Sequence, residues 1–438
     1  MKPFNPQLFF FFIVHSSSFT FHISYAQEPL SLSDAINRGL KNNFQIQISK
    51  ANTEIAANNN RWGQAGLLPS ITYNLTQNNS LTDQQNPTSF FNGKFTNNSF
   101  QNNVDVGWTI FNGFKVWMTK DKLEKLQQQS LGNGVVIVEN TVQAIILAYN
   151  SCLLEKEKMS VLKKVLSLSK DRYNYVLQKK ELGSAVTFDV LQVKTALLTD
   201  SSNFVSQEFN YKNAVRTLNL LMGDDAEIQF SLTAQLETTN AIYDVNALKT
   251  KMLANNSTLK NQYINQEILK RETDLQEANL YPKINLNTGA TNSKTRVNRE
   301  EQTRTGSTTN YYANFSLSFN LFNGGKTKTN IQNAKIQEKI AQLNTKEMEL
   351  KMISQLTGLI EKYNTRAVLL NIAKENMNSA ELNLQLAKEK FQNGTITSFE
   401  YRDVQLNYLN IALSNLTSVY NLIDTNTELM RVTGGIIQ

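Results

Sequence analysis

The chain carries a long internal duplication, and this feature constrains its fold more than any other. Three motifs occur twice, and their glycines are 211 residues apart in each case: Gly113 and Gly324, Gly183 and Gly394, and Gly223 and Gly434. No net insertion therefore separates the two copies between these points. A repeat of this length is one large architectural half that has been copied, not a solenoid of short units. We therefore expect the function in what two tandem halves build together.

The duplication leaves an N-terminal segment and two structural repeats. Residues 1–26 are typical of a secretory signal, because Lys2 precedes the apolar run 8–14 and small residues close the segment. Residues 27–225 form the first predicted repeat and residues 226–438 the second. Each is predicted to contain, in order, a helix, a β-hairpin, a long helix and a further helix.

Composition removes several function classes. Both histidines, His15 and His22, lie within the predicted signal, and Cys152 is the only cysteine. The mature chain therefore lacks histidine as a general base or metal ligand, and a single thiol forbids an internal disulfide. The formal net charge of +7 is spread over 438 residues without a basic cluster, unlike a nucleic-acid-binding surface. We expect no enzyme, no catalytic residue, no cofactor, no metal and no nucleic-acid partner.

Long helices are predicted in both repeats. Proline is absent from residues 88–281 and after residue 282, as long helices require. The stretch between Gly113 and Gly183 is predicted to be a helix of about 68 residues, which at ~1.5 Å per residue would reach ~100 Å. Such a helix cannot fold into a compact domain and must pack along partners. The Gly-Asn-Gly sequence at 132–134 predicts a kink in it.

A coiled-coil seam follows the long helix in each copy. In the second copy the apolar residues are spaced alternately by three and four positions: Leu406, Leu409, Leu413, Leu416, Tyr420 and Ile423. In the first copy Asp200 and Gln207 occupy two positions of the same rhythm. These two polar residues either fix the helix register or face a water-filled interior.

Four other segments alternate between apolar and polar residues. They lie at residues 71–76, 104–110, 284–287 and 314–321. No stretch reaches the ~18 apolar residues of a membrane-spanning helix, but strands of about 9–11 residues with one apolar face span outer membranes. We therefore predict four membrane strands with lipid on one face and water on the other. The polar stretches 77–99 and 291–310 are predicted to be exposed hairpin loops.

Four strands are too few to close a barrel. An open sheet edge is not tolerated in hydrocarbon, and the smallest natural barrels have about eight strands. Chains must therefore share their strands. Two copies would give eight strands around a lumen filled by side chains, and three would give twelve around a passage. The long helices would extend away from the membrane.

Several short motifs, repeated in register, resemble those of the TolC-type outer-membrane efflux proteins. They are Leu-Ser-Leu-Ser-Asp-Ala-Ile at 30–36 ahead of Leu-Lys-Asn-Asn at 40–43, Leu-Pro and Tyr-Pro before the strands, the two Phe-Asn-Gly turns, and the turns at Gly183 and Gly394. The resemblance covers nearly the whole mature chain. It implies a mostly α fold with long antiparallel coiled-coil helices in an α-barrel, and four strands per chain in a shared 12-strand trimeric β-barrel.

The resemblance also implies a function and partners. A homotrimer of this kind lies in the outer membrane of a Gram-negative bacterium, contacts outer-membrane lipid and extends into the periplasm. It is the exit duct of a tripartite efflux or type I secretion system. The duct is passive, and a periplasmic adaptor (membrane fusion) protein and an inner-membrane pump open it. No catalytic activity is implied.

The resemblance assigns roles to residues where the long helices turn. The helix-turn tips would dock the adaptor: Gly183, Ser184, Ala185, Val186, Gly394, Thr395, Ile396 and Thr397. The periplasmic gate or selectivity ring would comprise Glu400, Asp403, Asp189 and Phe391. Glu400 and Asp403 are three residues apart on a helix and therefore share a face. Threefold symmetry would gather six carboxylates, favouring cations and raising some carboxylate pKa values by repulsion.

This chain departs from the best-known family member at two gate positions. Phe391 stands in place of a tyrosine, and Ile396 stands in place of an arginine. A latch of hydrogen bonds and salt bridges at those positions cannot be carried over. We predict a looser or more apolar gate.

Other interpretations stand beside these. Glu400 and Asp403 are also explained as solvated acids near a helix N-terminus, where negative charge is favourable. Gly183 and Gly394 are explained as structural turn residues. The alternative function is a trimeric outer-membrane adhesin or structural coiled-coil protein with a shared barrel anchor. That plan would place the strands together in the sequence, whereas here each hairpin is embedded in a copy of the helical unit.

Overall fold

The computed structural model describes residues 28–88, 92–238, 241–300 and 302–437. The predicted signal, 1–26, lies outside the described residues. The first copy contains β1 (Glu28–Leu30), α1 (Leu32–Asn42), α2 (Phe44–Asn59), β2 (Ser70–Gln84), β3 (Gly93–Phe111), α3 (Lys115–Glu181) and α4 (Thr187–Met222). The second contains β4 (Phe230–Leu232), α5 (Val245–Asn255), α6 (Ser257–Glu277), the 3-10 turn η1 (Ala278–Leu280), β5 (Lys283–Arg299), β6 (Gln302–Ser318), α7 (Lys326–Gln392) and α8 (Ser398–Val432).

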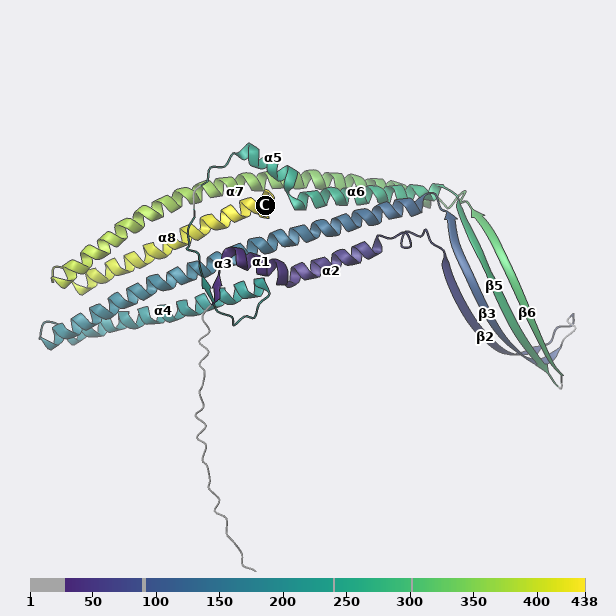
Figure 1. The fold of residues 1–438 in the computed structure, drawn as a ribbon, viewed down its shortest axis with the longest axis horizontal. Coiled ribbons are helices and arrows are strands. Elements are labelled where there is room, and N and C mark those ends of the chain that lie inside the picture. Colours follow the sequence, from purple (N-terminus) through teal and green to yellow (C-terminus); the bar gives the residue numbers. More distant parts are fainter. Residues whose placement is uncertain (1–27, 89–91, 239–240, 301, 438) are drawn as a thin grey trace, which may run out of the picture.

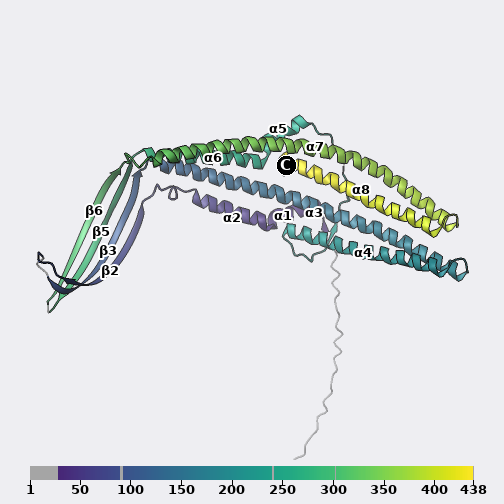
Figure 2. The same cartoon turned by 180° about the vertical axis from the view of Figure 1, so that it is seen from behind.

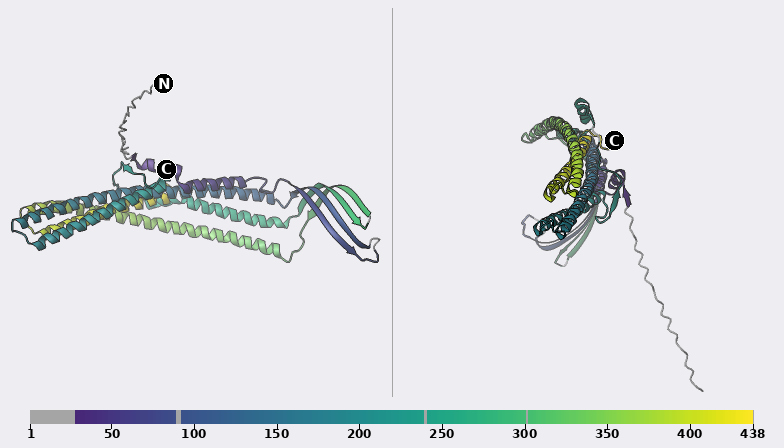
Figure 3. Two further views of the ribbon diagram at one scale, coloured as in Figure 1. Left: turned by 90° about the horizontal axis from the view of Figure 1, so that it is seen from below. Right: turned by 90° about the vertical axis from the view of Figure 1, so that its left-hand side faces the viewer.

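The molecule is an elongated helical body with a four-stranded sheet at one end (Figure 1; Figure 2 shows it from behind). Helices α3 and α7 each contain 67 residues, which corresponds to ~100 Å. Each folds back through a short turn into α4 or α8, and both turns lie at the end opposite the sheet. Seen from the end, the helices form a curved wall rather than a closed bundle (Figure 3, right).

The duplication is visible in matching contacts. Asn43 caps α2, and its side-chain amide donates to the Leu221 carbonyl at 2.8 Å. Asn256 caps α6 in the same way and donates to the Val432 carbonyl at 2.9 Å. Beside each contact a glycine with positive φ, Gly223 or Gly434, closes the preceding long hairpin. The two halves are thus one structural plan used twice.

The predicted kink in the first long helix was wrong. Helix α3 runs without a break through residues 132–134. The two glycines instead serve packing, because a Cβ on Gly132 would lie 1.9 Å from the amide oxygen of Asn261 on α6. Absence of a side chain therefore lets α6 approach α3 closely.

The sheet contains the four predicted strands in the order β2-β3-β5-β6, all antiparallel. The predicted loops were wrong in extent: β2, β3, β5 and β6 have 15, 19, 17 and 17 residues, so most of 77–99 and 291–310 belongs to strands. Cross-strand pairing holds these Asn- and Thr-rich segments although they lack an apolar face. Within the described part of the chain, the first and last strands, β2 and β6, are hydrogen-bonded to another strand on one side only.

The register places apolar residues of all four strands on one face. Ile71 pairs with Val106, and Tyr73 pairs with Val104. Further along β3, Trp108 pairs with Leu286, which in turn pairs with Phe315. Because paired residues point to the same side of a sheet, these side chains form one apolar face, the outer face, and the Ile71, Tyr73 and Phe315 side chains are well exposed.

The opposite face, the inner face, is polar. Tyr312 lies above Gly289 and crosses β5, and its hydroxyl donates to the Asp105 carboxylate at 2.6 Å. Asn103 also approaches this hydroxyl, at 3.3 Å. One face of the sheet is therefore suited to lipid and the other to water.

One helix contradicts the sequence-based statement about membrane helices. Helix α3 contains a stretch long and apolar enough to cross a membrane by length and composition alone. Its residues Ile145, Tyr149 and Cys152 are buried in a core with α1, α4 and β4. Of the apolar stretch, 22% is buried, so part of its apolar surface is used in packing within the helical body.

Candidate functional site

The two turns between the long helices have the same geometry. Gly183 and Gly394 have φ values of 75° and 72°, in the left-handed region. The amide of Ser184 donates to the Lys179 carbonyl at 2.7 Å, and the amide of Thr395 donates to the Lys390 carbonyl at 2.8 Å. These bonds end the helices in the pattern of a Schellman motif. Apart from the adjoining residues, no atom of the described residues lies within 4 Å of a Cβ built on either glycine, so the backbone conformation alone favours glycine here.

The acids after each turn cap the following helix. The backbone amide and hydroxyl of Thr397 donate to the Glu400 carboxylate at 2.7 and 2.9 Å, and the Val186 amide donates to Asp189 at 3.1 Å. These hydrogen bonds from Thr397 hold the pKa of Glu400 below its usual range. Capping thus accounts for the position of Glu400 and opposes the rise in pKa expected from clustered acids. Asp403 is exposed one turn further along α8.

The fold brings the two turns together. A cavity of about 990 Å³ lies between them and is lined by residues of both copies. Six of the eight predicted docking residues line it, together with Asp189 and Phe391 of the predicted gate: Ser184, Ala185, Gly394, Thr395, Ile396 and Thr397. Several apolar side chains of the first turn are exposed, with Leu182 at 81%, Val186 at 62% and Phe188 at 68%. We call the two turns, 182–188 and 393–399, the tip.

Phe391 has a different environment from the other predicted gate residues. Its side chain is 6% exposed and belongs to the core that joins the two hairpins. It stacks on Tyr401 with ring centroids 4.8 Å apart and contacts the edge of Tyr175 at the same distance. Within one chain Phe391 therefore holds α7 against α3 and α8, while Glu400 and Asp403 lie on the surface.

Beneath the tip lies a buried ion pair that the sequence did not reveal. Asp200 of α4 is 2% exposed and accepts two hydrogen bonds from the guanidinium of Arg402 on α8, at 2.7 and 2.9 Å. The Ser169 hydroxyl on α3 donates to the same carboxylate at 2.5 Å. We call these three residues the clamp, since they connect the hairpin of the first copy to that of the second. The only signal in the sequence was an acid on the apolar seam.

A second arginine lies beside the clamp. Arg172 is 2% exposed and donates to the Ser398 carbonyl at 3.4 Å, at the start of α8. Burial, and then the charge of Arg402, lowers the pKa of Arg172 to about 10, while Asp200 opposes that shift. Two arginines therefore depend on one buried carboxylate for electrostatic compensation.

The other polar seam residue also proves to be structural. Gln207 is 7% exposed, and its amide donates to the backbone carbonyl and the carboxylate of Glu155, at 3.0 and 2.5 Å. This contact joins α4 to α3 within the first hairpin. Of the two alternatives from the sequence, the structure supports a role in helix register for both Asp200 and Gln207.

Solved structures of bacterial channels share this fold. The Campylobacter jejuni CmeC outer membrane channel superposes with a TM-score of 0.76 and 16% identity, covering 92% of this chain and 85% of that one. The outer membrane protein VceC from Vibrio cholerae gives 0.73 and 13%, covering 92% and 96%. The open state of the Neisseria gonorrhoeae MtrE outer membrane channel gives 0.71 and 13%, covering 93% and 89%.

Sequence comparison identifies the family. No curated protein sequence gives a match. The family described as outer membrane efflux protein, however, matches the chain twice, over residues 35–224 and 248–435. Each match lies within one of the two predicted repeats, and neither includes the predicted signal. The resemblance to TolC-type channels is confirmed, as is the mostly α fold with four strands per chain, and this chain belongs to the outer membrane efflux protein family of non-enzymatic transport ducts.

Proposed function

We propose that this chain is one third of a trimeric exit duct, whose sheet lies in the outer membrane and whose helices extend into the periplasm. A periplasmic adaptor and an inner-membrane pump open it at the tip. Family membership supports an outer-membrane efflux function. The observation that carries the trimer is the sheet, which has a lipid-compatible face and two open edges.

The edges require partners. Strands β2 and β6 contain 15 and 17 residues, and among the residues that the structure describes they pair only with β3 and β5, respectively. In hydrocarbon every unpaired backbone group costs several kcal/mol, so both edges must be closed. Joining β2 of one copy to β6 of the next closes a ring. Three copies give twelve strands, and the polar inner face with Asp105 and Tyr312 suits a water-filled passage better than the packed lumen of an eight-stranded barrel.

The helical body has matching apolar stripes. On α4, Leu191, Leu198 and Val205 are seven residues apart and 58–62% exposed. Helix α7 lies at the other edge of the curved wall (Figure 3), and its residues Val368 and Ile372, four positions apart, are 59% and 60% exposed. Apolar residues spaced by four or seven positions are typical of coiled-coil contacts. We infer that α4 of one copy packs against α7 of its neighbour and that three curved walls complete an α-barrel.

The tip is the proposed gate and docking site. Exposed apolar groups at Leu182, Val186 and Phe188 offer a surface for adaptor helices. Glu400 and Asp403 of three copies would meet at the entrance and favour cations. Because the tyrosine and arginine of the family latch are absent, the closed state would depend on contacts within each chain, such as Phe391 stacking and the clamp.

The architecture is tested by mass and conductance. The purified protein in detergent should have three times the mass of the mature chain, and it should form cation-selective pores in planar bilayers. Asp403→Asn should reduce the cation selectivity while leaving the Glu400 cap intact. The control Glu54→Gln, an exposed acid on α2, should leave selectivity unchanged. A monomer without pore activity would refute the proposal.

A further inference from the structure

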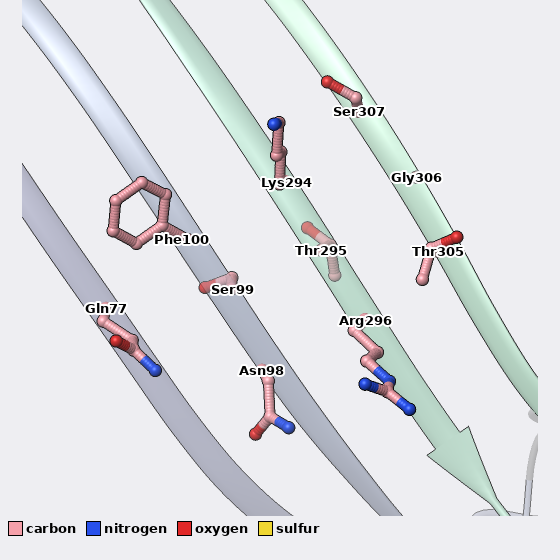
Figure 4. Close-up of a pocket in the computed structure, with 10 residues that line it drawn as sticks. All are labelled: Gln77, Asn98, Ser99, Phe100, Lys294, Thr295, Arg296, Thr305, Gly306 and Ser307. Atoms are coloured by element: carbon pink, nitrogen blue, oxygen red, sulfur yellow. The ribbon is translucent and has the colours of Figure 1, made fainter.

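A basic cavity lies on the outer face of the sheet, far from the helices. Its volume is about 550 Å³, and its lining includes Phe100, Lys294 and Arg296 on neighbouring strands (Figure 4). Phe100 pairs with Lys294, which pairs with Ser307. In the next row, Arg296 lies between Asn98 and Thr305. The register therefore places both cations on the same face as the apolar residues.

The height of these cations on the sheet matches a membrane boundary. From Ile284, near the helical end, to Lys294 the strand advances ten residues, or ~34 Å at ~3.4 Å per residue. A strand tilt of ~40° converts this into ~26 Å along the barrel axis, and the apolar band of outer-membrane barrels is ~25 Å tall. Lys294 thus lies where hydrocarbon ends, and Arg296 lies one step further out.

The local charge favours an anion. None of the ten residues that line the cavity is acidic. Asp83, an acid on the outer face, pairs with Lys94 two rows beyond Arg296 and on the far edge of the sheet. Asp105 belongs to the inner face, where it is bonded to Tyr312. Lys294 and Arg296 are both exposed, and the Nε of Arg296 donates to the Asn298 side chain at 3.2 Å. Its terminal nitrogens have no hydrogen-bond partner among the described residues and can bind a ligand.

We propose that Lys294 and Arg296 bind the phosphate groups of an anionic glycolipid in the outer leaflet. The two side chains are ~7 Å apart along the strand, close enough to hold one phosphate or two on adjacent sugars. An arginine fork and a lysine are standard phosphate ligands. Phe100 lies beside them at the upper limit of the apolar band, where it contacts the first acyl carbons. This proposal rests on the proposed membrane orientation of the sheet.

The test measures lipid retained by the purified full-length protein. The protein is reconstituted with a bis-phosphorylated glycolipid or its dephosphorylated form, and bound lipid is counted by native mass spectrometry. We expect the variant Lys294→Gln/Arg296→Gln to retain about 30-fold less of the phosphorylated lipid, since each basic residue at an anionic surface contributes roughly fivefold. Dephosphorylated lipid should bind the variant and the wild type equally.

The matched control is Arg304→Gln, compared with Arg296→Gln. Arg304 pairs with Val297, so it lies at nearly the same height but on the inner face. It should have no effect on lipid retention, whereas Arg296→Gln should lower it about fivefold. Equal effects would show a general charge effect and overturn the proposal.

Two further probes distinguish other ligands. If inorganic phosphate alone binds in a Lys294-dependent manner while the glycolipid does not, the site takes free phosphate and the lipid proposal fails. It also fails if polyglutamate, and not lipid, distinguishes wild type from variant, because the ligand is then an acidic protein. Conductance distinguishes failure of the lipid site from failure of the proposed function. If the protein forms pores but wild type and variant retain the phosphorylated lipid equally, only the lipid site is refuted. If it forms no pores, the proposed function is refuted.

Discussion

Removing Arg402 from the clamp should strongly weaken the contact between the two hairpins. The carboxylate of Asp200 is 2% exposed, and in Arg402→Leu it keeps the Ser169 hydroxyl but loses both charged hydrogen bonds. Breaking a buried ion pair by removing one partner costs about 3–5 kcal/mol, because a buried charge is left uncompensated. We expect about 3 kcal/mol, at the lower end of that range, since Ser169 remains and Arg172 lies nearby.

A double-mutant cycle isolates the interaction. In Asp200→Leu/Arg402→Leu both charges are replaced by apolar groups, and such replacements are often neutral or stabilising. The double variant should therefore recover most of the loss, with a coupling free energy of about 2–3 kcal/mol. Ser169→Ala is the mild control, since it removes one hydrogen bond and should cost about 1 kcal/mol.

The assay is hydrogen exchange at the start of α8, together with single-channel conductance. Arg402→Leu should speed exchange of the backbone amides after Thr397 and increase the time spent in open states. The double variant should restore slow exchange. The single variant Asp200→Leu completes the cycle: if the double variant loses as much stability as Asp200→Leu and Arg402→Leu lose in sum, the coupling is zero and the clamp does not hold the hairpins together.

Three other predictions concern the helical body. Capping lowers the pKa of Glu400 below its ordinary 4.5. The ionised carboxylate therefore stabilises α8 above pH 4.5, and this stabilisation is lost as pH falls through the folded-state pKa. Glu400→Gln should abolish this pH dependence of hydrogen exchange at the α8 N-terminus. Burial raises the pKa of the Cys152 thiol to about 12, so maleimide at pH 8 should label this thiol only when the protein unfolds. The control variant Ser184→Cys should react at once. Equal labelling rates of the two thiols would contradict the buried position of Cys152. Gly394→Ala should lower the free energy of unfolding by about 1–2 kcal/mol, because alanine disfavours the left-handed backbone. Gly223→Ala should lower it more, because its Cβ would also lie 2.5 Å from the Asn42 carbonyl oxygen. Thermal melting followed by circular dichroism would show the reverse order of the two variants if this reasoning is wrong.

Periodic patterns predicted the elements of the fold well. The predicted helix between Gly113 and Gly183 corresponds to α3, and the four alternating segments correspond to β2, β3, β5 and β6. These predictions succeed because burial on one face imposes a period on the sequence. They fail in the Asn- and Thr-rich parts of the strands, where cross-strand hydrogen bonds rather than an apolar face maintain the pairing.

The candidate site was predicted less completely. The turns at Gly183 and Gly394 and their capping acids could be predicted, because turn and cap residues act within a few positions. The clamp could not, since Asp200 and Arg402 are 202 residues apart and each alone is an ordinary charged residue on a helix. Phe391 was assigned from the resemblance, whereas its burial against Tyr401 follows only from how four helices meet.

The sequence by itself determined that two copies of one unit exist, that each contains very long helices and a hairpin, and that the strands are too few to seal a barrel alone. These properties are local or periodic, so a linear pattern contains them. Only the tertiary structure decided that Arg402 neutralises Asp200 and that β5 extends through Lys294 and Arg296, which places both on the lipid-compatible face. The reason is physical: charge pairing and cross-strand pairing depend on distances between segments that the order of residues does not express.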